Sequence, residues 1–233
     1  MQYLNPYIEI CLEETPSIFK GLNQKDKETI SQHHTLAIIK KGEFLFKEGE
    51  KSRGLICLAS GKVKVFKEGV GGREQILKMV RQQGFIGYRA LFSDNTWSVS
   101  AAAIEDSAIC ILEKNSLVKI LKKNADLALK FIKVIAEELE FSNNRTVSLT
   151  QKHIRGRLAE SLLVLRDTYG YEADGKTIRV SLSREDIANL SNMTTSNAIR
   201  TLSNLAGECI IGIEGRKISI LDNINLEHIC ELG

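Results

Sequence analysis

The chain has 233 residues, of which 43% are hydrophobic and 26% are charged, and its formal net charge is +3. This length is enough for two modest domains with separate cores, and the composition is that of an ordinary globular protein. No apolar run approaches the roughly 20 residues that a membrane-spanning helix needs. The first residues also lack the basic and apolar regions of a signal peptide. We therefore expect a cytoplasmic protein that does not contact a membrane.

The cysteines are scattered along the chain and form neither a C-x-x-C pair nor the spacing of a metal site. Cys57 and Cys110 lie within apolar, strand-like runs, where a free cysteine behaves as a small hydrophobe. We expect both to be ordinary core residues. A disulfide framework is not expected in a chain of this length with so few cysteines. The full set is Cys11, Cys57, Cys110, Cys209 and Cys230.

Residues from about 34 to 112 have the pattern of short strands separated by glycines. Residues 62–67 alternate polar and apolar side chains, as in a half-buried strand, and residues 69–72 supply a turn before a second run at 75–80. Several short strands with regular turn signals predict a sandwich, barrel or jelly roll. Further strands are expected at 36–39, 44–46, 54–58, 98–103 and 107–112.

The hydrophobic period changes after Glu113 to the alternating spacing of four and three that is typical of a coiled-coil seam. A second stripe of Leu127, Phe131 and Val134 lies beside it, so a helix here has two faces to bury. We expect the second stripe to pack on the strands and the seam to meet another copy of the chain. The alternative is a helix packed entirely within its own domain. The seam residues are Ala128, Ile132, Ile135, Leu139, Ser142, Thr146 and Leu149.

Residues 180–205 have the pattern of two short helices joined by a tight turn, after a helix break near 148–152 and a new amphipathic helix from His153. Ser183 is a good N-cap for the first short helix, and Thr194 is one for the second. Asn192 lies where the end of a helix favours a left-handed residue. The buried residues are expected to be Ile187, Leu190, Ala198, Leu202 and Leu205.

Two apolar runs at 210–213 and 217–221 flank Glu214, Gly215 and Arg216, which is the pattern of a β-hairpin. Residues 177–180 could pair with it. A helix-turn-helix presents the start of its second helix to the DNA major groove, and the hairpin would be its wing. The alternative is a helical hairpin that packs against something other than DNA. Between Thr150 and Lys217 there are ten Lys and Arg against eight Asp and Glu, so a basic footprint could only be a local patch.

The runs LSREDIA at 182–188, RTL at 200–202 and GRKI at 215–218 resemble the winged helix-turn-helix of the CRP/FNR (cyclic-AMP receptor protein / fumarate–nitrate regulator) superfamily of bacterial transcription regulators. Upstream, KGE at 41–43, GKVKV at 61–65 and GFIG at 84–87 resemble landmarks of that family's cyclic-nucleotide-binding roll. GRLA at 156–159 resembles the start of its DNA-binding domain.

The resemblance implies an α+β fold. Residues 1–115 would form N-terminal helices and a cyclic-nucleotide-binding-like β-roll (a double-stranded β-helix or jelly roll). Residues 116–150 would form the dimerisation helix, and 151–233 the winged helix-turn-helix. The implied function is a homodimeric, sequence-specific transcription regulator with double-stranded DNA and RNA polymerase as partners. No pattern of an enzyme site is present, so we do not expect an enzyme.

By resemblance, Arg200 matches the family's guanine-reading arginine, and Ser196 stands where many relatives carry a glutamate that accepts a hydrogen bond from the cytosine amino group. Arginine can bond guanine O6 and N7 together. The alternative is that Arg200 pairs with Glu185 or Asp186. In a dimer the two recognition helices would meet half-sites about 34 Å apart. The expected DNA-contacting residues are Ser183, Arg184, Thr194, Thr195, Ser196, Asn197 and Arg200.

Members that bind cyclic AMP carry a glutamate directly after the GFIG glycine and an Arg-Ser pair further on. The glutamate accepts from a ribose hydroxyl, and the arginine grips the cyclic phosphate. Here Tyr88 replaces the glutamate and Trp97 the arginine, so we expect cyclic AMP not to be the effector. The alternative is a cyclic-nucleotide-responsive regulator with a divergent cassette. Residues expected around an effector pocket, or a filled one, are Gly87, Tyr88, Arg89, Trp97, Ser98, Ser142 and Asn143.

The cofactors of other family branches also lack their ligands. An iron–sulfur cluster needs about four thiolates, and Cys11 is the one cysteine near the N-terminus. His33 and His34 are adjacent and precede the first expected strand, so we interpret them as solvated loop residues rather than haem ligands. We therefore expect no iron–sulfur cluster, haem or other metal.

Overall fold

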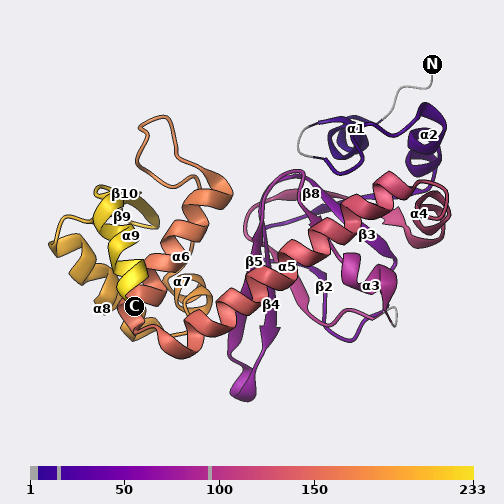
Figure 1. Cartoon of the computed structure of the whole chain (residues 1–233). Helices are drawn as coiled ribbons and strands as arrows, with labels where there is room; N and C mark the ends of the chain where they lie inside the picture. The colour runs from indigo at the N-terminus through magenta and orange to yellow at the C-terminus, as the bar shows by residue number, and fades with distance from the viewer. Residues whose placement is uncertain (1–4, 15–16, 94–95) are drawn as a thin grey trace. The chain divides into compact units, whose positions relative to one another are not determined.

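The structure is a computed structural model that describes residues 5–14, 17–93 and 96–233 (Figure 1). The chain divides into two compact units. The first consists of the described residues up to Lys67 together with Lys78–Glu140. The second consists of Glu68–Leu77 and Phe141–Gly233.

The first unit is built on the predicted roll of short antiparallel strands. One sheet has the order β1-β8-β3-β6 and the other the order β2-β7-β4-β5. The predicted strands are confirmed, and His34 begins β1 rather than preceding it, because β1 pairs along its whole length with β8. The strands are β1 (His34–Ile39), β2 (Phe44–Phe46), β3 (Gly54–Ser60), β4 (Val63–Glu68), β5 (Glu74–Val80), β6 (Phe85–Ile86), β7 (Ser100–Ala103) and β8 (Ser107–Glu113).

Alternate residues of β3 and β8 enter two different cores, which explains why both strands are buried on both faces. One core lies between the two sheets and includes Ile56, Leu58 and Ile109. The other lies between the first sheet and the helices, and includes Leu55 and Leu112. The helices of this unit are α1 (Pro6–Glu13), α2 (Gln24–Gln32), α3 (Tyr88–Phe92), α4 (Lys114–Leu121) and the first part of α5 (Ala125–Gln151).

The segment 116–150, expected as one helix, is two helices in the structure. It breaks after α4, and Asn124 restarts the helix by accepting a hydrogen bond from the Leu127 backbone at 3.0 Å. Figure 1 shows α2 beside α4, and the two helices contact one another. Within the described residues, no helix is both long and apolar enough to cross a membrane.

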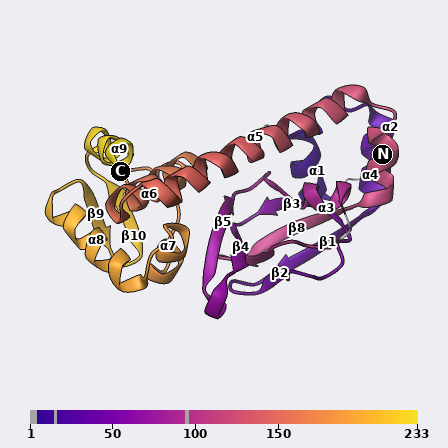
Figure 2. The same ribbon diagram turned by 60° about the horizontal axis from the view of Figure 1, so that its bottom comes forward.

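The second unit contains the predicted helix-turn-helix and hairpin. The chain leaves α5 at Gln151 and re-enters helix at Ile154, where the break was predicted. Figure 2 shows α8 next to the β9–β10 hairpin. A C-terminal helix that the sequence pattern did not predict packs on α6. The elements are α6 (Ile154–Tyr169), α7 (Arg184–Leu190), α8 (Thr195–Gly207), β9 (Ile211–Glu214), β10 (Lys217–Ile220) and α9 (Asn223–Leu232).

Candidate nucleic-acid interface and sensor site

The turn between α7 and α8 is fixed by the three residues that the sequence pattern singled out. Ser183 Oγ accepts from the Asp186 backbone at 2.9 Å, and Thr194 Oγ1 accepts from the Asn197 backbone at 3.2 Å. Asn192 has a φ of 50°, the left-handed conformation that ends α7. Both caps and the turn are therefore confirmed, and they set the start of α8.

The two faces of α8 differ in chemistry. Its buried stripe consists of Ala198, Leu202 and Leu205, as predicted. The opposite face exposes Thr195, Ser196, Ile199 and Arg200, while Asn197 is half-buried. An exposed polar face at the start of a capped helix is the arrangement with which such helices meet base edges and phosphates.

The predicted wing is confirmed. Glu214 pairs with Lys217 across a tight turn in which Gly215 has a positive φ of 56°. Ile178 donates to Ile218 at 2.9 Å, so the segment before α7 pairs with the hairpin as expected. Arg184 donates to the Gly215 carbonyl at 2.8 Å, which ties the start of α7 to the wing.

Three exposed cations, Arg200 on α8 and Arg216 and Lys217 at the wing, belong to the helix-turn-helix and its hairpin. Within the described residues, the ion pairs of the second unit involve Arg145, Lys152, Arg155 and Arg166, and none involves Arg200, Arg216 or Lys217. Arg200 donates to Asn197 Oδ1 at 3.0 Å, rather than pairing with Glu185 or Asp186. Arg216 and Lys217 were missed as interface candidates, although two basic residues beside a hairpin turn are a readable signal.

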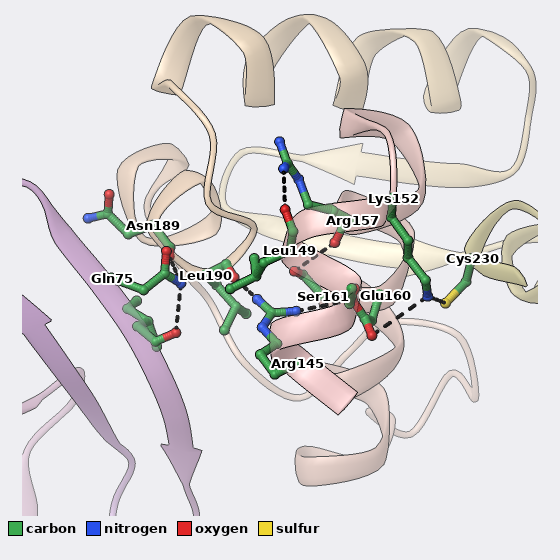
Figure 3. A network of polar contacts seen from close by, with 12 residues as sticks. Gln75, Arg145, Leu149, Lys152, Arg157, Glu160, Ser161, Asn189, Leu190 and Cys230 are labelled. Carbon is green, nitrogen blue, oxygen red and sulfur yellow. Dashed lines mark hydrogen bonds and ion pairs between the residues drawn. The ribbon is translucent and has the colours of Figure 1, made fainter. Parts of the chain in front are cut away.

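A polar network fastens the end of α5 to the helix-turn-helix (Figure 3). Arg145 donates to the carbonyl of Leu190, the last residue of α7, and to Glu160 of α6. Burial lowers the pKa of the Arg145 guanidinium, and the nearby Glu160 carboxylate offsets part of that effect. Ser148 also donates to Glu160. Residues 141–151 thus share a unit with α6 and α7.

The interior of the roll is filled by Trp97. Its side chain is 6% exposed and stacks on Phe46, with ring centroids 3.9 Å apart and an interplanar angle of 16°. Gly87 has a φ of 96°, and a Cβ at that position would collide with the Trp97 ring. The glycine therefore allows the indole to lie against the backbone. The presence of a tryptophan at position 97 had indicated that the pocket could be filled, but its stacking partner Phe46 could not be identified from the sequence.

Tyr88 packs on the other side of α3, among the residues that face the helices. Burial and a hydrogen bond to Glu138 of α5 raise the pKa of Tyr88 well above its usual range. Lys78 forms an ion pair with Glu138, and its ammonium lies 5.6 Å from the Tyr88 ring centroid. Lys78 and Glu138 were missed by the sequence reasoning, because nothing in the spacing links β5 to that turn of α5.

The chain matches two family models in the order that the fold displays. Residues 37–124 match the cyclic nucleotide-binding domain, and residues 156–229 match the Crp-like helix-turn-helix domain. The chain belongs to the CRP/FNR family of transcription regulators.

Curated relatives and solved structures of the CRP/FNR family align over most of the chain. A CRP-like cAMP-activated global transcriptional regulator of Mycobacterium tuberculosis is 25% identical over 90% of this chain and 94% of its own. The anaerobic regulatory protein of Bacillus subtilis is 26% identical over 88% of each chain. The structure of FixK2 from Bradyrhizobium japonicum matches with a TM-score of 0.76 at 24% identity, covering 84% of this chain and 96% of that one.

The remaining residues expected around an effector in this CRP/FNR protein are exposed, and they belong to both units. Arg89 and Ser98 are exposed, and the Ser98 carbonyl accepts from Lys67 at 3.4 Å. Ser142 and Asn143 are exposed on the part of α5 that belongs to the second unit. His33 and His34 each place a ring nitrogen against a backbone carbonyl, of Thr29 and Ser31 respectively. No cluster of three or more potential metal-binding side chains is present among the described residues.

An exposed apolar seam runs along the first part of α5. The side chain of Ile132 is 61% exposed and that of Leu139 is 62% exposed, which agrees with the prediction that these seam residues are not covered by their own chain. Ile135 and Ala128, assigned to the same seam from the sequence, instead pack on the core of their own unit. Leu129, 62% exposed, takes a place on the free face. The second stripe packs on the roll as predicted, with Leu127 and Phe131 each 2% exposed.

Proposed function

We propose that the protein is a homodimeric, sequence-specific DNA-binding regulator whose roll does not bind cyclic AMP as an effector. The observation that carries the proposal is the contrast between a capped α8 with an exposed face that includes Arg200 and a roll in whose core Trp97 is buried. RNA polymerase is the protein partner that such a regulator would use at a promoter.

DNA binding is supported by the chemistry of the α8 face and the wing. Arg200 can donate two hydrogen bonds to guanine O6 and N7. Thr194, Thr195 and Asn197 offer short polar groups suited to phosphates, and Ser196 is too short to replace a glutamate at cytosine. The exposed Arg216 and Lys217 would neutralise phosphates beside the wing. Arg184 would act through the wing, because its guanidinium donates to the Gly215 carbonyl at the turn.

Dimerisation is supported by the seam of Leu129, Ile132, Ala136 and Leu139, whose spacing of three, four and three places them on one face of α5. All four are exposed within one protomer. A second copy of the chain presents the same seam and would bury it in a symmetric pair. The pair would then carry two recognition helices to half-sites about 34 Å apart.

Loss of cyclic-AMP sensing is supported by the groups at the two positions that would hold the nucleotide. A cyclic phosphate needs a cation, and the indole of Trp97 offers none. Tyr88 is turned toward Glu138 and does not offer a carboxylate to a ribose. The effector, if one binds, would have to displace Trp97 or use the surface near Tyr88, Lys78 and Glu138.

Selection of operators from a random DNA library, with the full-length protein and its Arg200→Ala variant, tests the DNA-binding proposal. We expect a palindromic site with a guanine at the position read by Arg200, and a loss of about 1–3 kcal/mol of discrimination at that pair in the variant. Thr201→Ala, next to Arg200 but half-buried, is the matched control and should keep the motif. The assignment fails when the variant recovers the same guanine preference.

A further inference from the structure

A buried pair of cysteines joins the N-terminal helix to the roll. Cys11 of α1 and Cys57 of β3 form a disulfide, with Cα atoms 6.0 Å apart and 46 residues between them in the sequence. This corrects the expectation that Cys57 is an ordinary core residue with a free thiol. The pairing depends on the packing of α1 over β3, which the sequence spacing does not reveal.

We propose that this disulfide is a reversible redox clamp that holds α1 on the sensor core. α1 is held otherwise by few groups. Ile8 and Leu12 are buried beside Cys11, and the Ser17 hydroxyl donates to the Cys11 carbonyl at 2.5 Å. Breaking the clamp leaves an eight-residue helix held by this small apolar face and by the ion pair of Glu13 with Lys27 of α2 at 2.7 Å. Such a short helix is marginal on its own and depends on its packing.

A third cysteine lies next to the clamp without joining it. Cys110 is directly opposite Cys57 in the antiparallel pairing of β3 with β8, so both side chains point to the same face of the sheet. Cys110 is fully buried, and burial raises the pKa of its thiol to about 11. A thiol that stays protonated is a poor nucleophile for disulfide exchange. The arrangement thus favours the pair that links two elements over the pair within one sheet.

The chemistry needs a peroxide as oxidant and a dithiol as reductant. In a transiently opened α1, one thiolate of the pair attacks hydrogen peroxide, forms a sulfenic acid and releases hydroxide. The second thiolate attacks that sulfur, the S–S bond forms, and a second hydroxide leaves. Two thiols lose two electrons and two protons, and the peroxide becomes two waters. A dithiol reverses the change by exchange and leaves as its own disulfide.

The clamp shares its core with the start of α5. Phe19, which follows α1, packs edge-on against Phe131 of α5 with ring centroids 6.0 Å apart, and against Phe85 at 5.4 Å. Cys11, Cys57, Leu127 and Phe131 belong to one contiguous cluster. Release of α1 would therefore loosen the packing that seats α5 on the roll.

Thiol counting with peptide mapping tests the clamp in the full-length protein. After denaturation in the presence of the alkylating reagent, protein reduced with a dithiol should be alkylated at all five cysteines, and protein treated with hydrogen peroxide at three, with the Cys11 and Cys57 peptides linked. Cys110→Ser is the matched control and should form the same link, whereas Cys11→Ser should not. A Cys57–Cys110 link, free Cys11 and Cys57 after peroxide, or a link that a dithiol cannot open in the folded protein each overturns the proposal.

Hydrogen exchange tests the clamping, and the chemically reduced wild type removes any dependence on how the variants fold. Amides of residues 6–13 should exchange about tenfold faster or more in the reduced protein, and those of 125–134 faster by a smaller factor. Equal exchange of 6–13 in the two states would show that the disulfide does not clamp α1. Adding operator DNA is unnecessary, so failure of this test leaves the DNA-binding proposal untouched.

Discussion

The helix-turn-helix and the roll's cassette are two regions of one chain in which the family pattern is kept to very different degrees. In the first, the caps at Ser183 and Thr194 and the exposed Arg200 follow the pattern. In the second, the backbone motif at 84–87 is kept, but Trp97 and Tyr88 replace the groups that would hold a nucleotide. A fold can therefore preserve the scaffold of a binding site while its interior becomes part of the core. Substitutions at the exposed positions of the helix-turn-helix should therefore weaken DNA binding, whereas substitution of Trp97 in the cassette should lower the stability of the fold.

The largest effect is expected from breaking the seam of α5, on which the proposed binding of two DNA half-sites depends. Replacing both Ile132 and Leu139 by glutamate places charges in an interface that must be desolvated. Sedimentation should show monomers, and operator affinity should fall by about 100-fold or more, because the two half-sites no longer bind as one unit. Glu137→Lys, exposed on the same helix outside the seam, should stay dimeric. A double variant that remains a dimer would contradict the seam.

The next effect concerns the roll, where Trp97 should behave as a core residue. Trp97→Ala removes a stacked, 6% exposed ring and should lower the free energy of unfolding of the first unit by about 3–5 kcal/mol, measured by urea denaturation. Ser98→Ala, at the adjacent exposed position, should change it by less than about 0.5 kcal/mol. A loss at Trp97 no larger than that at Ser98 would mean that the ring is not part of the core.

The smallest effect is a pH dependence of the stability, which comes from Asp174 in the turn between α6 and α7. Hydrogen bonds from the Thr177 hydroxyl and from the backbone of Thr177 and Lys176 lower the pKa of Asp174 to about 2. Because the folded pKa lies below the unfolded value, the carboxylate stabilises the fold above pH about 4, and this is lost as pH falls through about 2. In Asp174→Asn, the urea concentration at the midpoint of unfolding should therefore fall less steeply between pH about 4 and pH about 2 than in the wild type. Glu172→Gln, at an exposed acid of the same turn, should leave it unchanged.

Local patterns predicted most of the fold. The strands were recognisable from alternation and glycines, and the helix-turn-helix from the residues at Ser183, Asn192 and Thr194, because caps and turns are determined by neighbours in sequence. The break between α4 and α5 was not predicted, because residues 116–150 were assigned to one helix, although the capping residue Asn124 stood there.

Three side-chain contacts between distant segments could not be predicted. The Cys11–Cys57 pair, the Tyr88–Glu138 hydrogen bond and the stacking of Trp97 on Phe46 each join elements that only the topology brings together. The free face of α5 was misplaced in part for the same reason. Ile135 has the spacing of a seam residue, but the roll already covers it, and Leu129 is exposed instead.

We propose above all that the chain binds DNA sequence-specifically and that its cassette does not bind cyclic AMP. The most direct measurement is an operator-binding isotherm of the full-length protein, recorded with and without millimolar cyclic AMP on the site recovered by selection. The account predicts specific binding with the same Kd in both conditions, and no heat of nucleotide binding by calorimetry. A Kd that tightens on addition of the nucleotide would show that another cation, such as Arg89, holds the phosphate, and would contradict the account.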